Sequence, residues 1–420
     1  MKENTNPPIP FASGVFNHRS KTFGVLDGRR GHKQSDRCDL TERLNKLRRS
    51  GLKPLAITRL SVGSDHSVHD VLAPLLPRHD FRERSPDQVR VAVFGATGYI
   101  GRFVVKELVE RGYQVMAFAR ESSGIGGRQG QAAVVDDFPG ADVRFGDVTN
   151  PVSLATDAFN EPTDVVISCL ASRTGGKKDS WAIDYAANLN AYNEGKRAGV
   201  AHFVMLSAIC VQKPILEFQK AKLSFENLLR KDTEITHTIV RPTAFFKSIA
   251  GQFESCKKGA PYVMFGNGEL TRCKPISEKD LACFLVNCVN ETDKVNQVLP
   301  IGGPGPALSA RTQGEILFKT LGRSPRMLSL PMAMMNAPTA ILEKVAMLVP
   351  AVEDTAEFAR IGCYYASESM LVWDEKRKCY DPDATPSFGD DTLEQFFERV
   401  NKEGMAGQEL GDAAIFKKSS

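Results

Sequence analysis

The amino-acid sequence predicts an α/β fold, in which a doubly wound parallel sheet is followed by a smaller, mostly helical C-terminal lobe. From residue 89 to residue 242, short apolar strands alternate with helical patterns, which is typical of parallel sheets covered by helices on both faces. After residue 242 the alternation stops and helical patterns predominate. The 420 residues, 42% hydrophobic and 25% charged, suffice for one large α/β domain with additions.

The first strand and helix are joined by a glycine-rich turn. A β-branched run at 89–94 stops at Gly95, an amphipathic helical pattern starts at Tyr99, and a second strand follows at 114–120. The spacing Gly-x-x-Gly-x-x-Gly in this context is typical of a Rossmann-type dinucleotide-binding turn, where backbone and helix N–H groups approach a pyrophosphate. The cofactor contacts expected here are Gly95, Thr97, Gly98, Tyr99, Ile100, Gly101 and Arg102.

The other elements follow in chain order. Strands are expected at 141–148, 164–171, 202–208 and 236–240, with helices at 151–160, 179–199 and 216–230. Further helices are expected at 277–290, 309–321, 332–348, 353–366 and 392–403, with a short strand at 298–301. We divide the chain into a largely disordered N-terminal extension (1–88), a dinucleotide-binding domain (89–250) and a substrate-binding lobe (251–420).

The end of the second strand favours NADPH as the cofactor. An NAD-binding turn places Asp or Glu at this strand tip to bind the ribose 2′-hydroxyl. This chain has Arg120 at the tip, Ser122 as a further donor, and Arg102 just after the third glycine. Because arginine binds a phosphate bidentately, we expect these residues to bind a 2′-phosphate.

The ends of the later strands supply the remaining expected contacts. Ligands of doubly wound sheets bind beyond the carboxyl ends of the strands, and Asp147 there can accept a hydrogen bond from the adenine amino group. The cofactor-binding residues expected at these strand ends are Asp147, Val148, Cys169, Leu170, Ala171, Ser207, Pro242 and Thr243.

The helix at 216–230 begins with a modified catalytic pattern. In short-chain dehydrogenases a Tyr-x-x-x-Lys opens this helix, with Tyr as acid and Lys lowering its pKa and binding the ribose. This chain has Phe218 in place of Tyr and keeps Lys222. Carbonyl reduction by a phenol at this position is therefore disfavoured, and Lys222 is the expected catalytic and cofactor-binding residue.

Longer strings resemble a narrower family. They include S-C-L-A-S-R-T-G-G-K-K-D-S-W from Ser168, L-S-A-I-C-V-Q-K-P from Leu206 and I-V-R-P-T-A-F-F-K-S from Ile239. These strings resemble the NADPH-dependent divinyl chlorophyllide 8-vinyl reductases, which belong to the atypical NmrA-like and isoflavone-reductase-like short-chain dehydrogenases. The resemblance spans residues 89–416. It implies reduction of the 8-vinyl group of divinyl chlorophyllide a, or of its protochlorophyllide precursor, to ethyl during chlorophyll synthesis.

The resemblance also implies a reason for Phe218. Hydride added to the terminal vinyl carbon leaves charge that spreads into the conjugated macrocycle, so only protonation of carbon remains and no strong phenol acid is obligatory. The proton donor stays open among Lys222, Glu217, water, Tyr364 and Tyr365.

Other side chains are candidates for binding the tetrapyrrole. Those that can stack on the macrocycle are Trp181, Phe245, Phe246 and Tyr262. Those that can pair with its propionate are Arg173, Lys177 and Lys178. Two other functions fit the glycine turn, a non-catalytic NADP-sensing regulator of the NmrA type and an isoflavone-reductase-like enzyme acting on small aromatics.

The charge is concentrated near the N-terminus. Residues 1–60 contain 13 Lys or Arg and 5 Asp or Glu, a local charge of +8, so the rest of the chain is at −4 within the total of +4. The later residues therefore show no basic face for nucleic acid. A basic extension without a secretory h-region is typical of an organelle transit peptide, and with the resemblance it predicts a chloroplast location.

The cysteines and the hydropathy exclude other classes. The nine cysteines are dispersed without a C-x-x-C pair, which predicts reduced thiols, no metal site and no iron–sulfur cluster. No apolar run approaches the ~18 residues of a membrane span. Peripheral association with a plastid membrane stays open, and the sequence carries no signal for oligomeric state.

Overall fold

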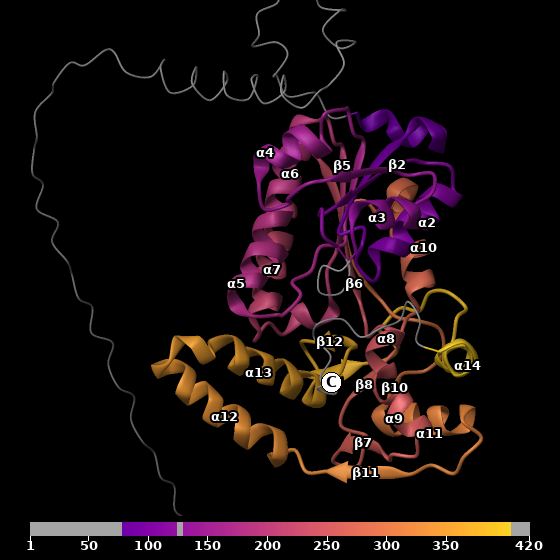
Figure 1. Cartoon of the computed structure of the whole chain (residues 1–420), viewed down its shortest axis with the longest axis vertical. Coiled ribbons are helices and arrows are strands. Elements are labelled where there is room, and N and C mark those ends of the chain that lie inside the picture. The colour runs from indigo at the N-terminus through magenta and orange to yellow at the C-terminus, as the bar shows by residue number, and fades with distance from the viewer. Residues whose placement is uncertain (1–77, 124–128, 405–420) are drawn as a thin grey trace, which may run out of the picture. The chain divides into compact units, whose positions relative to one another are not determined.

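A seven-stranded sheet forms the centre of the fold (Figure 1). The computed structural model describes residues 78–123 and 129–404. The strand order is β3-β2-β1-β4-β5-β6-β9, and each neighbouring pair is parallel. The strands are β1 (Arg90–Phe94), β2 (Gln114–Ala119), β3 (Asp142–Phe145), β4 (Val165–Ser168), β5 (His202–Leu206), β6 (Thr236–Pro242) and β9 (Gln297–Ile301). The order reverses between β1 and β4, which is where such sheets bind ligands.

Helices cover both faces of the sheet (Figure 1). On one face lie α2 (Gly101–Glu110), α3 (Gln131–Asp137) and α10 (Glu278–Asn290). On the other lie α4 (Pro151–Ser153), α6 (Asn188–Arg197) and α7 (Glu217–Leu229), and α5 (Lys177–Asp179) runs into α6 through a π-helical segment, Ser180–Ala187. The predicted doubly wound α/β fold is confirmed.

The side chains of β1 show how the sheet divides two cores. Val91 and Val93 belong to the core beneath α2 and α10, whereas Ala92 and Phe94 belong to the core on the opposite face. All four are completely buried. The alternation follows from the two-residue period of a strand, and it explains why the run reads as continuously apolar in the sequence.

A smaller lobe follows β6. Its helices are α8 (Phe246–Ile249), α9 (Phe253–Lys257), α11 (Ala310–Thr320), α12 (Ala333–Leu348), α13 (Glu353–Ser367) and α14 (Leu393–Glu403). Its strands form three pairs, β7 (Tyr262–Phe265) with β11 (Met327–Leu330), β8 (Arg272–Cys273) with β10 (Leu308–Ser309), and β12 (Val372–Asp374) with β13 (Cys379–Asp381). Among the described helices, none has the length and apolar character needed to cross a membrane.

Two elements from the second half of the chain return to the sheet. Strand β9 pairs with β6 along its length, and α10 packs against α2. The predicted boundary at residue 250 therefore cuts through the sheet, because 278–301 lie with the strands and helices of 89–250. The sequence analysis placed a helix and a strand there but could not show that they join the sheet, since this depends on contacts between distant residues.

The last residues of the predicted N-terminal extension are part of the fold. Phe81 is completely buried and stacks on the ring of His202. The segment 78–88 was assigned to the extension because it lacks periodicity, and this assignment is wrong for these eleven residues. The remainder of the extension, 1–77, lies outside the described residues.

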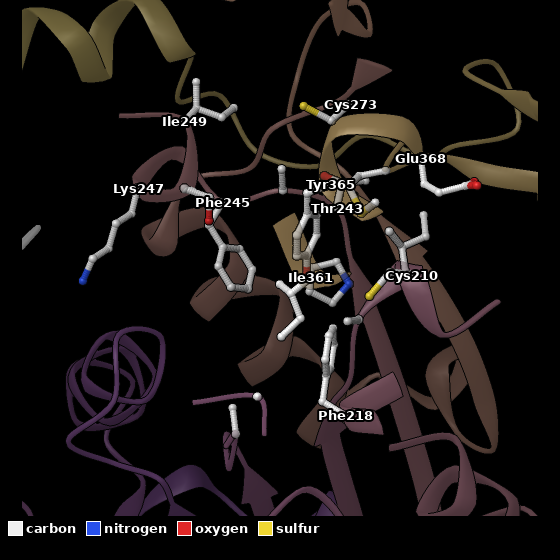
Figure 2. A pocket seen from close by; sticks show the side chains of 18 of the residues that line it. Cys210, Phe218, Thr243, Phe245, Lys247, Ile249, Cys273, Ile361, Tyr365 and Glu368 are labelled. Carbon is white, nitrogen blue, oxygen red and sulfur yellow. The ribbon is translucent and has the colours of Figure 1, made fainter. Parts of the chain in front are cut away.

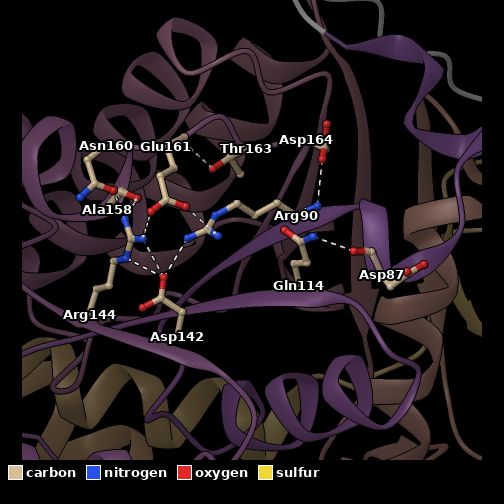
Figure 3. A network of polar contacts seen from close by, with 10 residues as sticks. All are labelled: Asp87, Arg90, Gln114, Asp142, Arg144, Ala158, Asn160, Glu161, Thr163 and Asp164. Carbon is tan, nitrogen blue, oxygen red and sulfur yellow. Dashed lines mark hydrogen bonds and ion pairs between the residues drawn. The ribbon is translucent and has the colours of Figure 1, made fainter. Parts of the chain in front are cut away.

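Ion pairs join the amino ends of the strands (Figure 3). Arg90 at the start of β1 contacts Asp142 at 2.8 Å and Glu161 at 3.0 Å. Asp164, completely buried just before β4, accepts from the Arg90 backbone N–H at 2.8 Å and pairs with Arg84 at 2.6 Å. These charges lie at the edge opposite the carboxyl ends of the strands, so they stabilise the sheet rather than a ligand.

Replacing Asp164 by alanine should lower the free energy of unfolding by about 2–4 kcal/mol, because a backbone N–H and the guanidinium groups of Arg78 and Arg84 lose their acceptor. Chemical denaturation measures the change. Asp142→Ala is the matched control, since Asp142 is 45% exposed and its loss should cost less than about 1 kcal/mol. Equal losses for the two variants would contradict this account of Asp164.

Candidate active site

A cavity of about 700 Å³ lies at the carboxyl ends of β4, β5 and β6. Its walls come from the loops after these strands, from α7 and from lobe elements including β7 and α13. Figure 2 shows Cys210, Phe218, Ile361 and Tyr365 on one side and Phe245 and Lys247 on the other. The side chains are mostly apolar with a few polar groups, which is the usual composition of a site for an organic ligand.

The glycine turn joins β1 to α2 beside the end of β4. Gly95 has a φ of +75°, and a Cβ there would lie 2.7 Å from the carbonyl oxygen of Cys169. A Cβ on Gly101 would lie 2.1 Å from the carbonyl oxygen of Gly95. Both glycines are therefore required by close backbone approach, and the turn aims the start of α2 along the sheet edge, as a pyrophosphate site requires.

The residues expected at the 2′-phosphate lie at the ends of neighbouring elements. Arg120 and Ser122 are exposed after β2, and Arg102 is in the first turn of α2. The Nε of Arg102 is buried and has no hydrogen-bond partner among the described residues. A buried guanidinium N–H without an acceptor is costly in a protein, so this arrangement fits an anionic ligand group at the turn.

Tyr99 and Asp147 make contacts of their own. The Tyr99 hydroxyl donates to Glu278 at 2.8 Å, and burial together with this carboxylate raises the pKa of Tyr99. Asp147 follows β3 and accepts from the backbone N–H and the hydroxyl of Thr149 at 2.8 Å and 2.7 Å, all through Oδ1. The carboxylate is exposed, and its contact with an adenine amino group stays a prediction.

Lys222 lies in the cavity wall and is fixed by two partners. Its Nζ is 3.0 Å from Oδ1 of Asp184 and donates to the carbonyl oxygen of Leu170 at 3.2 Å. Asp184 is completely buried, and it also accepts from the backbone N–H of Ser172 at 3.3 Å. One carboxylate thus positions both the lysine of α7 and the loop after β4.

The other expected cofactor residues lie along the same edge. Cys169, Leu170, Ala171, Ser207, Pro242 and Thr243 line the cavity together with Lys222. The Ser207 hydroxyl donates to the buried Glu226, which also pairs with Arg241, and the Thr243 hydroxyl donates to the Lys274 carbonyl. Val148 is buried in the loop after β3, and Ile100 is buried at the N-terminus of α2. The assignment of these residues to the cofactor stays a prediction.

The cavity thiols are protonated at physiological pH. Burial raises the pKa of Cys169 to about 12, against the nearby charge of Lys222, and raises the pKa of Cys210 to about 11. A protonated thiol is a poor nucleophile, so neither cysteine suits covalent catalysis. All eight cysteines in the described part of the chain are free, as the sequence predicted.

Several substrate candidates lie away from the cavity. Phe246 is completely buried against Phe396, and Trp181 donates to Glu217 at 2.9 Å on the outside of the fold. Lys177 pairs with Glu353 at the surface. Phe245, Tyr262 and Arg173 line the cavity, as does the proton-donor candidate Tyr365, whereas Phe246, Trp181 and Lys177 do not.

Asp184 is the main residue that the sequence analysis missed. It was hidden inside a helical pattern, W-A-I-D-Y-A-A from Trp181, where an acidic residue reads as a solvated position. A carboxylate among apolar neighbours was the available signal. Its partner Lys222 is 38 residues further along the chain, so only the fold brings the two together.

A glycine turn at the switch point of a parallel sheet, with a lysine in the adjoining cavity, is the architecture of the Rossmann-type nicotinamide-dependent oxidoreductases. A family model described as NAD(P)H-binding matches residues 95–292. The structure of the binary complex of leucoanthocyanidin reductase and NADPH from Vitis vinifera has a TM-score of 0.52 at 16% identity, covering 75% of this chain and 100% of that one. This likeness supports the fold.

Two curated relatives are much more similar. A chloroplastic divinyl chlorophyllide a 8-vinyl-reductase of Cucumis sativus is 54% identical over 345 residues, which cover 81% of this chain and 82% of that protein. The protein of the same name from Arabidopsis thaliana is 51% identical over 374 residues, 87% of each chain. This chain belongs to the divinyl chlorophyllide a 8-vinyl-reductase family, so the resemblance, the enzyme class and the chloroplast location predicted from the sequence are confirmed.

Proposed function

We propose that this protein reduces the 8-vinyl group of divinyl chlorophyllide a, or of divinyl protochlorophyllide, to ethyl with NADPH. The observation that carries the proposal is that Lys222 and Phe218 both line one large cavity. The lysine that is expected to bind the nicotinamide ribose is present, whereas the position of the phenol that protonates a carbonyl oxygen in short-chain dehydrogenases holds an apolar ring. Hydride addition to a conjugated C=C bond needs the first group and not the second.

The residues of the cavity suit this reaction. When bound, NADPH supplies the hydride. Lys222, fixed by Asp184, is placed to bind ribose hydroxyls and to orient the nicotinamide over the cavity. Phe218 and Phe245 offer apolar walls for a flat macrocycle, and Arg173 lies in the lining where a propionate carboxylate could pair with it.

We place the macrocycle between the ends of β4 to β6 and the inner face of α13, because both line the cavity. The cavity volume of about 700 Å³ is within the range of sites that enclose most of an organic ligand.

Arg120→Asp tests the choice of NADPH. The change should weaken NADPH binding by about 100-fold and leave NADH binding within a few fold, because it removes a phosphate partner and adds a repelling carboxylate. Titration of cofactor fluorescence measures both affinities. Glu121→Gln is the neighbouring control and should discriminate between the cofactors as the unaltered protein does. Equal losses of NADPH and NADH affinity would show that Arg120 does not bind the 2′-phosphate.

The function itself is tested by pigment chromatography. Recombinant protein is incubated with NADPH and divinyl chlorophyllide a, and the monovinyl product is separated from the substrate. The regulatory alternative predicts NADPH binding without any change in the pigment. Competition with small aromatic substrates separates an isoflavone-reductase-like activity, which would leave the chlorophyllide unreduced.

A further inference from the structure

A tyrosine from the lobe reaches the cavity wall that contains Phe218. Tyr365, near the end of α13, lines the cavity with 47% of its surface exposed. In Figure 2 its ring lies on the same side as Ile361, Cys210 and Phe218. The phenol that α7 lacks is therefore available from a different part of the chain.

Cys210, Tyr365 and Lys222 line the same cavity. Cys210 is 3% exposed and packs with Phe218 in one apolar cluster. Because Tyr365 and Lys222 both line this cavity, a ligand bound there can meet both side chains.

The other side chains considered as proton donors have hydrogen-bond or ion-pair partners outside the expected position of the vinyl group. Glu217 accepts from Trp181 at 2.9 Å and from Lys220 at 2.8 Å. The Tyr364 hydroxyl donates to the Cys210 carbonyl at 3.1 Å, and the Lys222 ammonium is bound to Asp184.

A second phenol of the cavity wall lies in the lobe. Tyr262 is on β7 and packs in the core formed by α9, α11 and α14, with Gly314 against its ring. Its cluster is separate from the one that contains Cys210 and Phe218. Tyr365 is therefore the cavity phenol that we assign to the side of Phe218.

We propose that Tyr365 is a catalytic residue, the donor of the proton that completes reduction of the vinyl group. The role rests on the proposed function. As hydride forms a C–H bond at the terminal vinyl carbon, the π bond breaks and its electron pair enters the macrocycle. The O–H bond of Tyr365 then breaks, its proton forms the second C–H bond at the inner carbon, and the phenolate regains a proton from solvent.

The surroundings of the Tyr365 hydroxyl keep it in the protonated, neutral form. Although 47% of the side chain is exposed to the cavity, burial of the hydroxyl among apolar neighbours raises the pKa of Tyr365 above the ordinary value, and Cys210 and Tyr364 raise it further. Because the folded-state pKa is raised, the phenol stays protonated throughout the physiological range and ionises only in stronger base. The donor is thus ready before hydride arrives.

Tyr365→Phe tests the proposal, with Tyr364→Phe as the matched control on the same helix. The first variant should lower kcat by about 100-fold or more, the usual contribution of a general acid. The second should leave kcat within about threefold, because it removes one hydrogen bond to a backbone carbonyl. NADPH affinity from cofactor fluorescence and pigment affinity from the Soret shift should stay unchanged in both.

The outcomes separate the possible failures. Near wild-type kcat in Tyr365→Phe, equal losses in the two variants, or a loss of NADPH or pigment binding in Tyr365→Phe would overturn the assignment while leaving the reductase function standing. An unaltered protein that binds both NADPH and pigment but forms no monovinyl product would overturn the proposed function, and this role with it.

Discussion

Lys222→Ala is expected to lower kcat by at least about 100-fold, because it removes the group that we propose orients the nicotinamide ribose. It should also lower the free energy of unfolding by about 3–5 kcal/mol, since Asp184 would be left as a buried carboxylate without its partner. The activity of this single variant alone would not separate the loss of catalysis from the loss of stability.

A double variant separates them. In Lys222→Met with Asp184→Asn, both charges are removed together, so stability should return to within about 1–2 kcal/mol of the unaltered protein. Activity should stay low, because the ammonium is still absent. Denaturation curves measure the first result, and pigment chromatography with saturating NADPH measures the second. Recovery of activity in the double variant would show that Lys222 is needed only to neutralise Asp184.

Gly101→Ala is expected to abolish NADPH binding and to cost about 3 kcal/mol or more of stability. A Cβ at this position would lie 2.1 Å from the carbonyl oxygen of Gly95, and that neighbour is backbone, which cannot rotate away as a side chain can. The start of α2 would have to move out of the turn, taking the pyrophosphate site with it.

Gly130→Ala provides the control for this substitution. Gly130 has a φ of −80°, and a Cβ there would meet nothing within 4 Å. The change should cost less than about 1 kcal/mol and leave NADPH affinity unaltered. Cofactor fluorescence and melting temperature measure both variants. Tight NADPH binding by Gly101→Ala would contradict the close packing of α2 on the turn.

The sheet and its glycine turn could be predicted because their signals are local. A strand that ends at Gly95 and a helix that starts within a few residues can be read from one stretch of chain. The same holds for the missing phenol at Phe218, since four residues separate it from Lys222. Each of these features depends on residues that are close together in sequence.

The rest of the site depends on contacts across the fold. Asp184 acquires its role from a lysine on another helix, and Tyr365 reaches the cavity from α13, more than 140 residues beyond Phe218. Of the aromatic candidates, Phe245 and Phe246 are neighbours in sequence, yet one lines the cavity and the other is core. Only the direction of each side chain distinguishes them.

The return of β9 to the sheet protects one of its edges. Without β9, β6 would be an open edge whose Ile239 and Val240, completely buried in the complete fold, have no outer neighbour. An exposed apolar edge of this kind pairs readily with other chains. Strand β9 thus protects the cofactor fold against aggregation, although a later part of the chain contributes it.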